Sequence, residues 1–278
     1  MPGVLALTPE WLALLSAWCL SLAAAGRSCS TIRLRRLQLE RLARWTGKDD
    51  PRQVSTADLE AWLGSSGWSR DTLRSHRAAV RAFYAWLVSA GHLERSPAAP
   101  LPAIRPAQPR PRPTPDAIYA DALARARGWE RLALRLGAEA GLRRAEIAAV
   151  HLADLEPDLT GWSLRVRGKG DRVRRVPLSD SLARAVLEAC RAGGGPAFPG
   201  QVDGHVSPGY LGKRVSALLP VGWSTHSLRH RFATRAYGVD RDVFTVQQLL
   251  GHASPETTRR YVALPDNRLR ATVEAIAA

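Results

Sequence analysis

The sequence predicts a mainly α-helical protein with a small β-sheet, built from an all-α N-terminal domain and an α+β C-terminal domain. Three observations support this prediction. Apolar residues recur at helical spacing over residues 8–92, eight prolines interrupt residues 96–115, and residues 162–167 alternate between apolar and polar as a strand does. We therefore expect domains at residues 1–95 and 116–278, joined by a proline-rich linker at residues 96–115.

Length and charge agree with two domains and a polyanionic partner. At 278 residues the chain exceeds the size at which one hydrophobic core keeps growing. Its net charge of +15 favours nucleic acid, although a basic chain can also be merely soluble. Three cysteines without a C-x-x-C pair argue against a secreted disulfide scaffold and fit a reducing cytoplasm.

The uncharged stretch at residues 11–25 is the one segment that could be taken for a signal peptide. No basic residue precedes it, and Glu10 lies where a positively charged region belongs. The stretch is also short for a membrane span. We expect a cytoplasmic protein without a membrane segment.

Four helices are predicted in the first domain, each opened by a hydroxyl or an acid that can cap it. They begin at Thr8-Pro9, Ser28, Ser55 and either Ser69 or Asp71. In the second helix, Leu34 and Leu37 belong to the expected apolar pattern. Basic residues share the polar faces, and solvation alone would explain them as well as DNA binding does. The candidates for DNA binding are Arg33, Arg36, Arg70, Arg74, Arg77 and Arg81.

The linker at residues 96–115 has no room for a helix or a strand ladder, so we expect an extended, polyproline-like segment. At about 3.1 Å per residue it could span roughly 60 Å. Three arginines make it basic. It could let two domains lie on opposite sides of a duplex.

In the second domain we expect helices over residues 116–128, 130–139, 179–192 and 207–219, with a β-hairpin at residues 162–177. A further helix is predicted to begin at a capping Thr225 and to end at Gly238. An apolar stripe over residues 243–250 predicts the next helix.

The motif A-G-L-R-R-A-E at residues 140–146 places two opposite charges one turn apart. Helical spacing puts Arg143 and Glu146 on one face, where they can pair. Taken alone, the pair is either an ordinary surface contact or part of a site.

Lys169 lies between two glycines at the predicted hairpin tip, in a chain that has only three lysines. A turn does not need a lysine. Unlike arginine, a partly desolvated lysine can lose its proton, so Lys169 suits a general acid. A solvated turn residue is the alternative.

His226, Arg229 and His230 are spaced i, i+3 and i+4 and therefore share one helical face. Two histidines at this spacing could bind zinc, but Ser227 replaces the glutamate of a metalloprotease motif and no cysteine is nearby. Free backbone amides at the helix N-terminus would favour a phosphate as well. His252 follows in a Gly-His turn, where a buried structural histidine is the alternative.

Tyr261 lies nine residues after His252 on a helix predicted to begin at Ser254-Pro255. A helical tyrosine is most often a packing residue. A phenol that attacks a phosphate needs help at neutral pH, and guanidinium and imidazolium groups could stabilise both the phenolate and the transition state. The sequence shows no carboxylate cluster suited to Mg²⁺, so we expect neither a metal nor another cofactor.

The chain resembles the tyrosine recombinase (phage integrase) family. The resemblance covers the second domain and is carried, in order, by A-G-L-R-R-A-E, G-K-G, H-S-L-R-H, L-L-G-H and the following tyrosine. The six catalytic positions of that family fall on Arg143, Lys169, His226, Arg229, His252 and Tyr261. The first domain is similar to the family's helical core-binding domain.

The resemblance implies a C-shaped clamp around duplex DNA and a 3′-phosphotyrosine intermediate formed by Tyr261. Arg143, Arg229 and His226 would hold the non-bridging oxygens with help from His252, and Lys169 would protonate the leaving 5′-oxygen. Glu146 and His230 would support these groups. The tail at residues 265–278 would dock on a neighbouring subunit in a homotetramer on two DNA sites, and a directionality factor is a possible further partner.

We expect a phage integrase without an arm-binding domain, because the helical domain begins by Thr8. A Xer-like recombinase for dimer resolution is the alternative. A type IB topoisomerase or telomere resolvase would use similar chemistry, but the short chain and the exchangeable tail argue against both. An inactive DNA-binding accessory protein would have no use for Lys169 and Tyr261.

Overall fold

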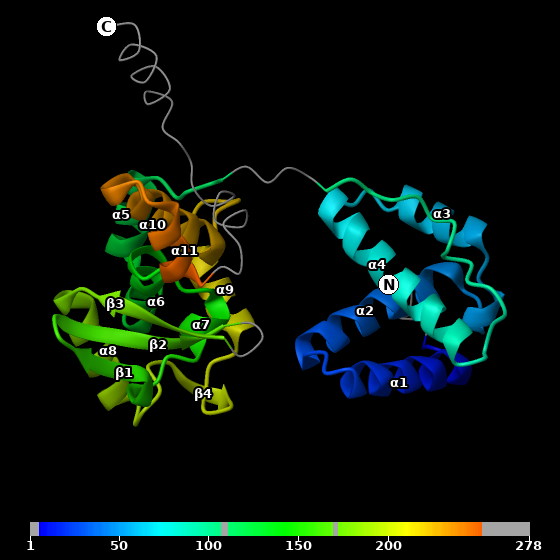
Figure 1. Cartoon of the computed structure of the whole chain (residues 1–278), viewed down its shortest axis with the longest axis horizontal. Coiled ribbons are helices and arrows are strands. Elements are labelled where there is room, and N and C mark those ends of the chain that lie inside the picture. Colours follow the sequence, from blue (N-terminus) through cyan, green and yellow to red (C-terminus); the bar gives the residue numbers. More distant parts are fainter. Residues whose placement is uncertain (1–5, 107–110, 169–171, 252–278) are drawn as a thin grey trace, which may run out of the picture. The chain divides into compact units, whose positions relative to one another are not determined.

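The computed structural model describes residues 6–106, 111–168 and 172–251 (Figure 1). The chain divides into two compact units, Met1–Gln108 and Pro109–Ala278. The described part is mostly helical with one three-stranded sheet, which confirms the predicted fold class. Within these residues no helix combines the length and apolar character needed to cross a bilayer.

The described part of the first unit is all-helical. Its elements are α1 (Pro9–Ala24), α2 (Cys29–Thr46), the 3₁₀ turn η1 (Pro51–Gln53), α3 (Thr56–Ser65) and α4 (Arg70–Ser89). The side chains of Thr8, Ser28, Ser55 and Ser69 each accept a hydrogen bond from a backbone N–H in the first turn of the helix that follows. The predicted helix starts are therefore confirmed, with Ser69 rather than Asp71 as the cap of α4.

The core of the first unit is built around the buried ring of Phe83 on α4. Trp18 meets this ring edge-on with centroids 5.2 Å apart, and Trp11 stacks on it at 6.1 Å. The apolar pattern predicted for α2 is wrong for Leu34 and Leu37, which are each 52% exposed. The buried stripe of α2 runs through residues 39, 42 and 43, and helical geometry places these two leucines on the opposite side.

The described residues of the proline-rich segment form neither helix nor strand, as predicted. Its two ends are nevertheless docked. Ala98 and Leu101 are buried in the core of the first unit, and Thr114 donates from Oγ1 to Ser227 Oγ over 2.9 Å in the second. The expected span of roughly 60 Å is therefore too long, because residues at both ends belong to the units themselves.

The described part of the second unit combines helices with the sheet. The helices are α5 (Asp116–Arg125), α6 (Trp129–Glu139), α7 (Arg144–Ala148), α8 (Asp180–Ala192), α9 (Pro208–Ala217), α10 (Thr225–Asp240) and α11 (Val243–Leu250), with the 3₁₀ turn η2 (Leu152–Asp154). The strands are β1 (Leu155–Asp158), β2 (Gly161–Arg167), β3 (Val173–Leu178) and β4 (Pro199–Val202).

The sheet is antiparallel in the order β1-β2-β3. Its register pairs Leu155 with Leu164 and Leu164 with Val176, and all three side chains are buried. The predicted hairpin is confirmed. Strand β1 was not predicted, because its sequence L-E-P-D contains two acidic residues and a proline, which are rare in strands.

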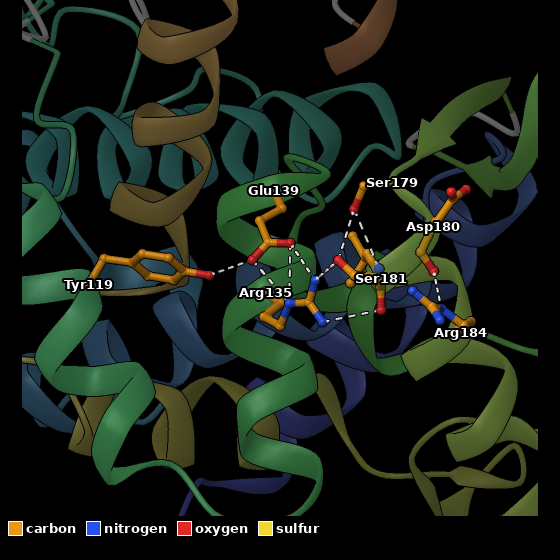
Figure 2. A network of polar contacts seen from close by, with 8 residues as sticks. Tyr119, Arg135, Glu139, Ser179, Asp180, Ser181 and Arg184 are labelled. Carbon is orange, nitrogen blue, oxygen red and sulfur yellow. Dashed lines mark hydrogen bonds and ion pairs between the residues drawn. The ribbon is translucent and has the colours of Figure 1, made fainter.

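A polar network connects three helices of the second unit (Figure 2). Tyr119 of α5 donates from Oη to Glu139 of α6 over 2.8 Å. Arg135 of α6 pairs with the same carboxylate at 2.9 Å and donates to Ser181 Oγ of α8, also at 2.9 Å. Because Glu139 accepts from both Tyr119 of α5 and Arg135 of α6, these contacts hold the two helices together.

Helix α10 differs from its prediction at both ends. Ser224, and not Thr225, is the cap, and its Oγ accepts from the backbone N–H of His226 at 3.2 Å. The helix continues through Gly238 to Asp240, and Arg241, with a φ of 61°, provides the left-handed cap. An arginine thus occupies the conformation for which sequence rules favour glycine, so the prediction of Gly238 was wrong.

Candidate active site

A pocket of about 620 Å³ lies in the second unit where the N-terminal ends of α7 and α10 meet one face of α9. Polar and basic side chains dominate its lining. The lining residues are Arg143, Arg144, Gly209, Gly212, Lys213, Ser216, Ser224, Thr225, His226 and Arg229. Four positive side chains and a helix N-terminus around one cavity suit an anion.

Glu146 holds Arg143 at the N-cap position of α7. Arg143 occupies the position just before the helix, and both its backbone N–H and its Nη1 donate to the Glu146 carboxylate, at 2.9 and 2.7 Å. The predicted contact between these residues is present, although Arg143 precedes the helix. Its side chain remains 37% exposed and can reach a ligand in the pocket.

Glu146 is buried and gathers three guanidinium groups from different parts of the chain. Besides Arg143, Arg174 of β3 donates to both carboxylate oxygens at 3.0 and 2.7 Å, and Arg229 Nη1 lies 3.7 Å from Oε2. Burial opposes ionisation of Glu146, but the hydrogen bonds from Arg174 and Arg143 outweigh it and lower its pKa to about 2. One negative charge among three positive ones leaves the pocket electropositive.

Arg229 is fully buried, and its guanidinium ties α10 to two other segments. Nη1 donates to the carbonyl oxygen of Gly141, and Nη2 donates to that of Leu250 over 2.6 Å. Gly141 has φ of +64°, and a Cβ there would lie 2.4 Å from the Phe232 ring. The A-G-L-R motif therefore needs glycine at position 141, because the backbone is left-handed there and Phe232 leaves no room for a Cβ.

The two histidines of H-S-L-R-H lie on one face of α10, as predicted. The rings of His226 and His230 meet edge-on with centroids 4.7 Å apart. His226 lines the pocket, whereas His230 is buried. Burial, followed by the positive charges of Arg229 and Arg143, lowers the pKa of His226, so its imidazole is mainly neutral at pH 7.

Arg174 is a residue that the sequence reading missed. Strand alternation would have indicated it, because Arg174 shares one face of β3 with the buried Val176 and Leu178. An arginine on the inner face of a strand must find a buried acid. Glu146 is that acid.

Three of the predicted catalytic residues, Lys169, His252 and Tyr261, lie outside the described residues. Of the predicted site residues, the structure brings together Arg143, His226 and Arg229 with Glu146 and His230, which are predicted to support them.

The six arginines predicted to bind DNA lie on α2 and α4 of the first unit. Arg33, Arg70, Arg74 and Arg81 are exposed. Arg36 pairs with Glu40 at 2.9 Å. Arg77 and Arg81 also donate to the carbonyl oxygens of Leu101 and Ala99, so they help to hold the start of the proline-rich segment. Their role in DNA binding stays a prediction.

Two family models match the chain. The phage integrase family matches residues 117–268, and the phage integrase N-terminal SAM-like domain matches residues 15–91. The tyrosine recombinase XerC of Xylella fastidiosa (strain M23) is 32% identical over 260 residues, which cover 86% of this chain and 87% of that protein. XerC of Xanthomonas campestris pv. campestris (strain B100) is 31% identical over 272 residues, covering 89% and 83%.

Solved structures share the fold. A lambda integrase dimer bound to a COC′ core site has a TM-score of 0.70 at 20% identity, with 90% of this chain and 76% of that chain covered. XerH bound to a palindromic difH substrate has a TM-score of 0.67 at 21% identity, covering 90% and 80%.

Sequence similarity and fold together define an enzyme that cuts and rejoins DNA. The chain belongs to the phage integrase family of tyrosine recombinases, and it is a site-specific recombinase.

Proposed function

We propose that the chain breaks and rejoins duplex DNA through a covalent 3′-phosphotyrosine at Tyr261. The observation that carries this proposal is the pocket in which Arg143, His226 and Arg229 meet around the buried Glu146. Such a pocket suits a phosphodiester, because its donors are fixed before the substrate arrives.

The proposed roles follow from the chemistry of each group. Tyr261 gives up its phenolic proton and attacks phosphorus, the bond from phosphorus to the 5′-oxygen breaks, and Lys169 supplies the proton to that oxygen. Arg143 and Arg229 stabilise the charge on the non-bridging oxygens, His226 donates a hydrogen bond to them, and His252 assists. Attack by a 5′-hydroxyl of a partner strand reverses the step and needs no ATP.

We propose that this chemistry runs without a metal ion. Two guanidinium groups next to the reacting phosphate would neutralise the charge that Mg²⁺ neutralises in other phosphoryl-transfer sites. The surplus of positive charge around Glu146 supports this role.

The proposed substrate is double-stranded DNA, contacted by the catalytic pocket and by the arginines of α2 and α4. The assembly is a homotetramer on two DNA sites, with residues 265–278 exchanged between subunits. A lambda integrase tetramer bound to a Holliday junction shares the fold at a TM-score of 0.68 and 21% identity, which supports this arrangement.

A Xer-like role is the second candidate beside phage integration, because XerC proteins match 86–89% of this chain.

The test is covalent trapping on suicide duplexes. A randomised duplex pool is first selected for binding, nicked derivatives of the selected sites are incubated with the protein in EDTA, and the products are resolved on a denaturing gel. We expect a protein–DNA band that is absent with Tyr261→Phe, whose duplex affinity is unchanged. A band that needs Mg²⁺, or one that persists in Tyr261→Phe, would contradict the proposal.

A further inference from the structure

Arg174 makes three hydrogen bonds from a largely buried side chain. Its Nη1 and Nη2 donate to the two oxygens of Glu146, and its Nε donates to the carbonyl oxygen of Leu249 over 2.9 Å. The side chain is 9% exposed, so these bonds form where water competes little.

These bonds join three elements that are far apart in sequence. Arg174 belongs to β3, Glu146 to α7 and Leu249 to the last turn of α11. In Figure 1, β3, α7, α10 and α11 all lie in the second unit. Glu146 in turn holds Arg143, and Arg229 caps the next carbonyl of α11, that of Leu250. Two guanidinium groups thus fix consecutive carbonyls at the end of the helix.

The Arg174 side chain and the end of α11 have little freedom to move relative to each other. A Cβ at Gly251 would lie 2.7 Å from Arg174 Cδ, so the chain passes directly over the arginine stem as it leaves α11. Gly251 has φ of +62°, which also favours glycine. Any shift of the Arg174 guanidinium would therefore move both the Glu146 carboxylate and the end of α11.

We infer that Arg174 is a positioning residue for DNA cleavage. Through Glu146, it fixes the position of Arg143 relative to the end of α11, the helix that precedes His252. This inference rests on the proposed function. Arg174 does not line the pocket, so it would act through Glu146. Lysine cannot replace it, because a single ammonium cannot give two parallel bonds to a carboxylate and a third to a carbonyl.

The first experiment compares Arg174→Met and Arg174→Lys with Arg175→Met under single-turnover conditions at saturating suicide DNA. Arg175 is the matched control: it is the next residue on β3, its side chain is 72% exposed, and it pairs with Glu156 at 2.9 Å. We expect both Arg174 variants to cleave on the order of 100-fold more slowly, as misplaced reacting groups do, with unchanged duplex affinity. Arg175→Met should match the wild type.

A pH profile separates positioning from folding. Arg143 from the segment before α7, Arg174 from β3 and Arg229 from α10 face Glu146. Without Arg174, burial of Glu146 is less opposed and its carboxyl takes up a proton at higher pH. The cleavage rate of Arg174→Met should therefore decrease as the pH is lowered, and its pH–rate profile should show an inflection that the wild-type profile lacks. Adding Glu146→Gln should remove this inflection.

Three outcomes would overturn the inference alone: wild-type cleavage by Arg174→Met, rescue by Arg174→Lys, or a rate loss accounted for by an equal loss of folded protein or DNA binding. Absence of any covalent adduct with the wild-type chain would overturn the proposed function, and this inference with it.

Discussion

Arg229 donates from Nη2 to the carbonyl oxygen of Leu250 over 2.6 Å, so the H-S-L-R-H helix holds the end of the helix that leads to His252. The same guanidinium reaches Gly141, in the loop that precedes Arg143. A residue expected to bind phosphate thus also organises the scaffold around it. Removing it should cost stability as well as activity.

Arg229→Ala should lower the free energy of unfolding by about 2–5 kcal/mol, because two buried carbonyls lose their donors and Glu146 loses a nearby cation. Urea unfolding measures this change. Arg235→Ala is the control on the same helix: its side chain is 61% exposed and pairs with Asp116, so the change should stay within about 0.5 kcal/mol. Equal effects of the two variants would contradict the structural role of Arg229.

Gly141→Ala should destabilise the protein more than Gly47→Ala. Both glycines have left-handed φ, +64° and +62°, so alanine is strained by about 1–2 kcal/mol at either position. Only at Gly141 would the new methyl group also overlap Phe232, which should cost roughly 1–3 kcal/mol more. Thermal or urea unfolding of the two variants gives the comparison, and similar losses would argue against the close approach.

Glu146→Gln should destabilise the folded chain at neutral pH but much less in acid. The folded pKa of Glu146, about 2, lies below the ordinary value of 4.5, so its stabilisation is complete above about pH 4.5. It is lost as the pH falls towards 2. The shift corresponds to about 3 kcal/mol. Urea unfolding of both proteins from pH 7 downwards should show a difference that shrinks below pH 4.5, whereas a constant difference would contradict this assignment.

His226 should titrate below its ordinary pKa of 6.5 in the folded chain, and bound phosphate should raise that pKa. Because the folded state takes up this proton less readily than the unfolded state, His226 costs stability as the pH falls below about 6.5 and contributes nothing above it. NMR titration of the imidazole checks the shift. Arg143→Gln should raise the pKa by removing a neighbouring charge, and an unchanged pKa in this variant would contradict the proximity.

The sequence predicted the helices well because their starts are chemically explicit. Thr8, Ser28, Ser55 and Ser69 each supply a hydroxyl cap immediately before an apolar period. Helix ends were harder to predict: Arg241 caps α10 with a left-handed φ of 61°, a conformation for which sequence rules favour glycine.

For the site, the sequence indicated which residues matter but not how they depend on one another. Spacing alone predicted the contacts of Arg143 with Glu146 and of His226 with His230, because the two members of each pair lie within four residues of one another. The contacts of Arg174 and Arg229 with the end of α11 span 75 and 21 residues of sequence. Only the packed fold shows such contacts.

Tyr261 is proposed to form the covalent bond to DNA, and locating the site of attachment in the trapped adduct tests this assignment. The trapped adduct is digested with nuclease and protease, and the modified peptide is sequenced by mass spectrometry. We predict a nucleotide linked through its 3′-phosphate to Tyr261. A nucleotide on any other residue, or one linked through a 5′-phosphate, would contradict the account.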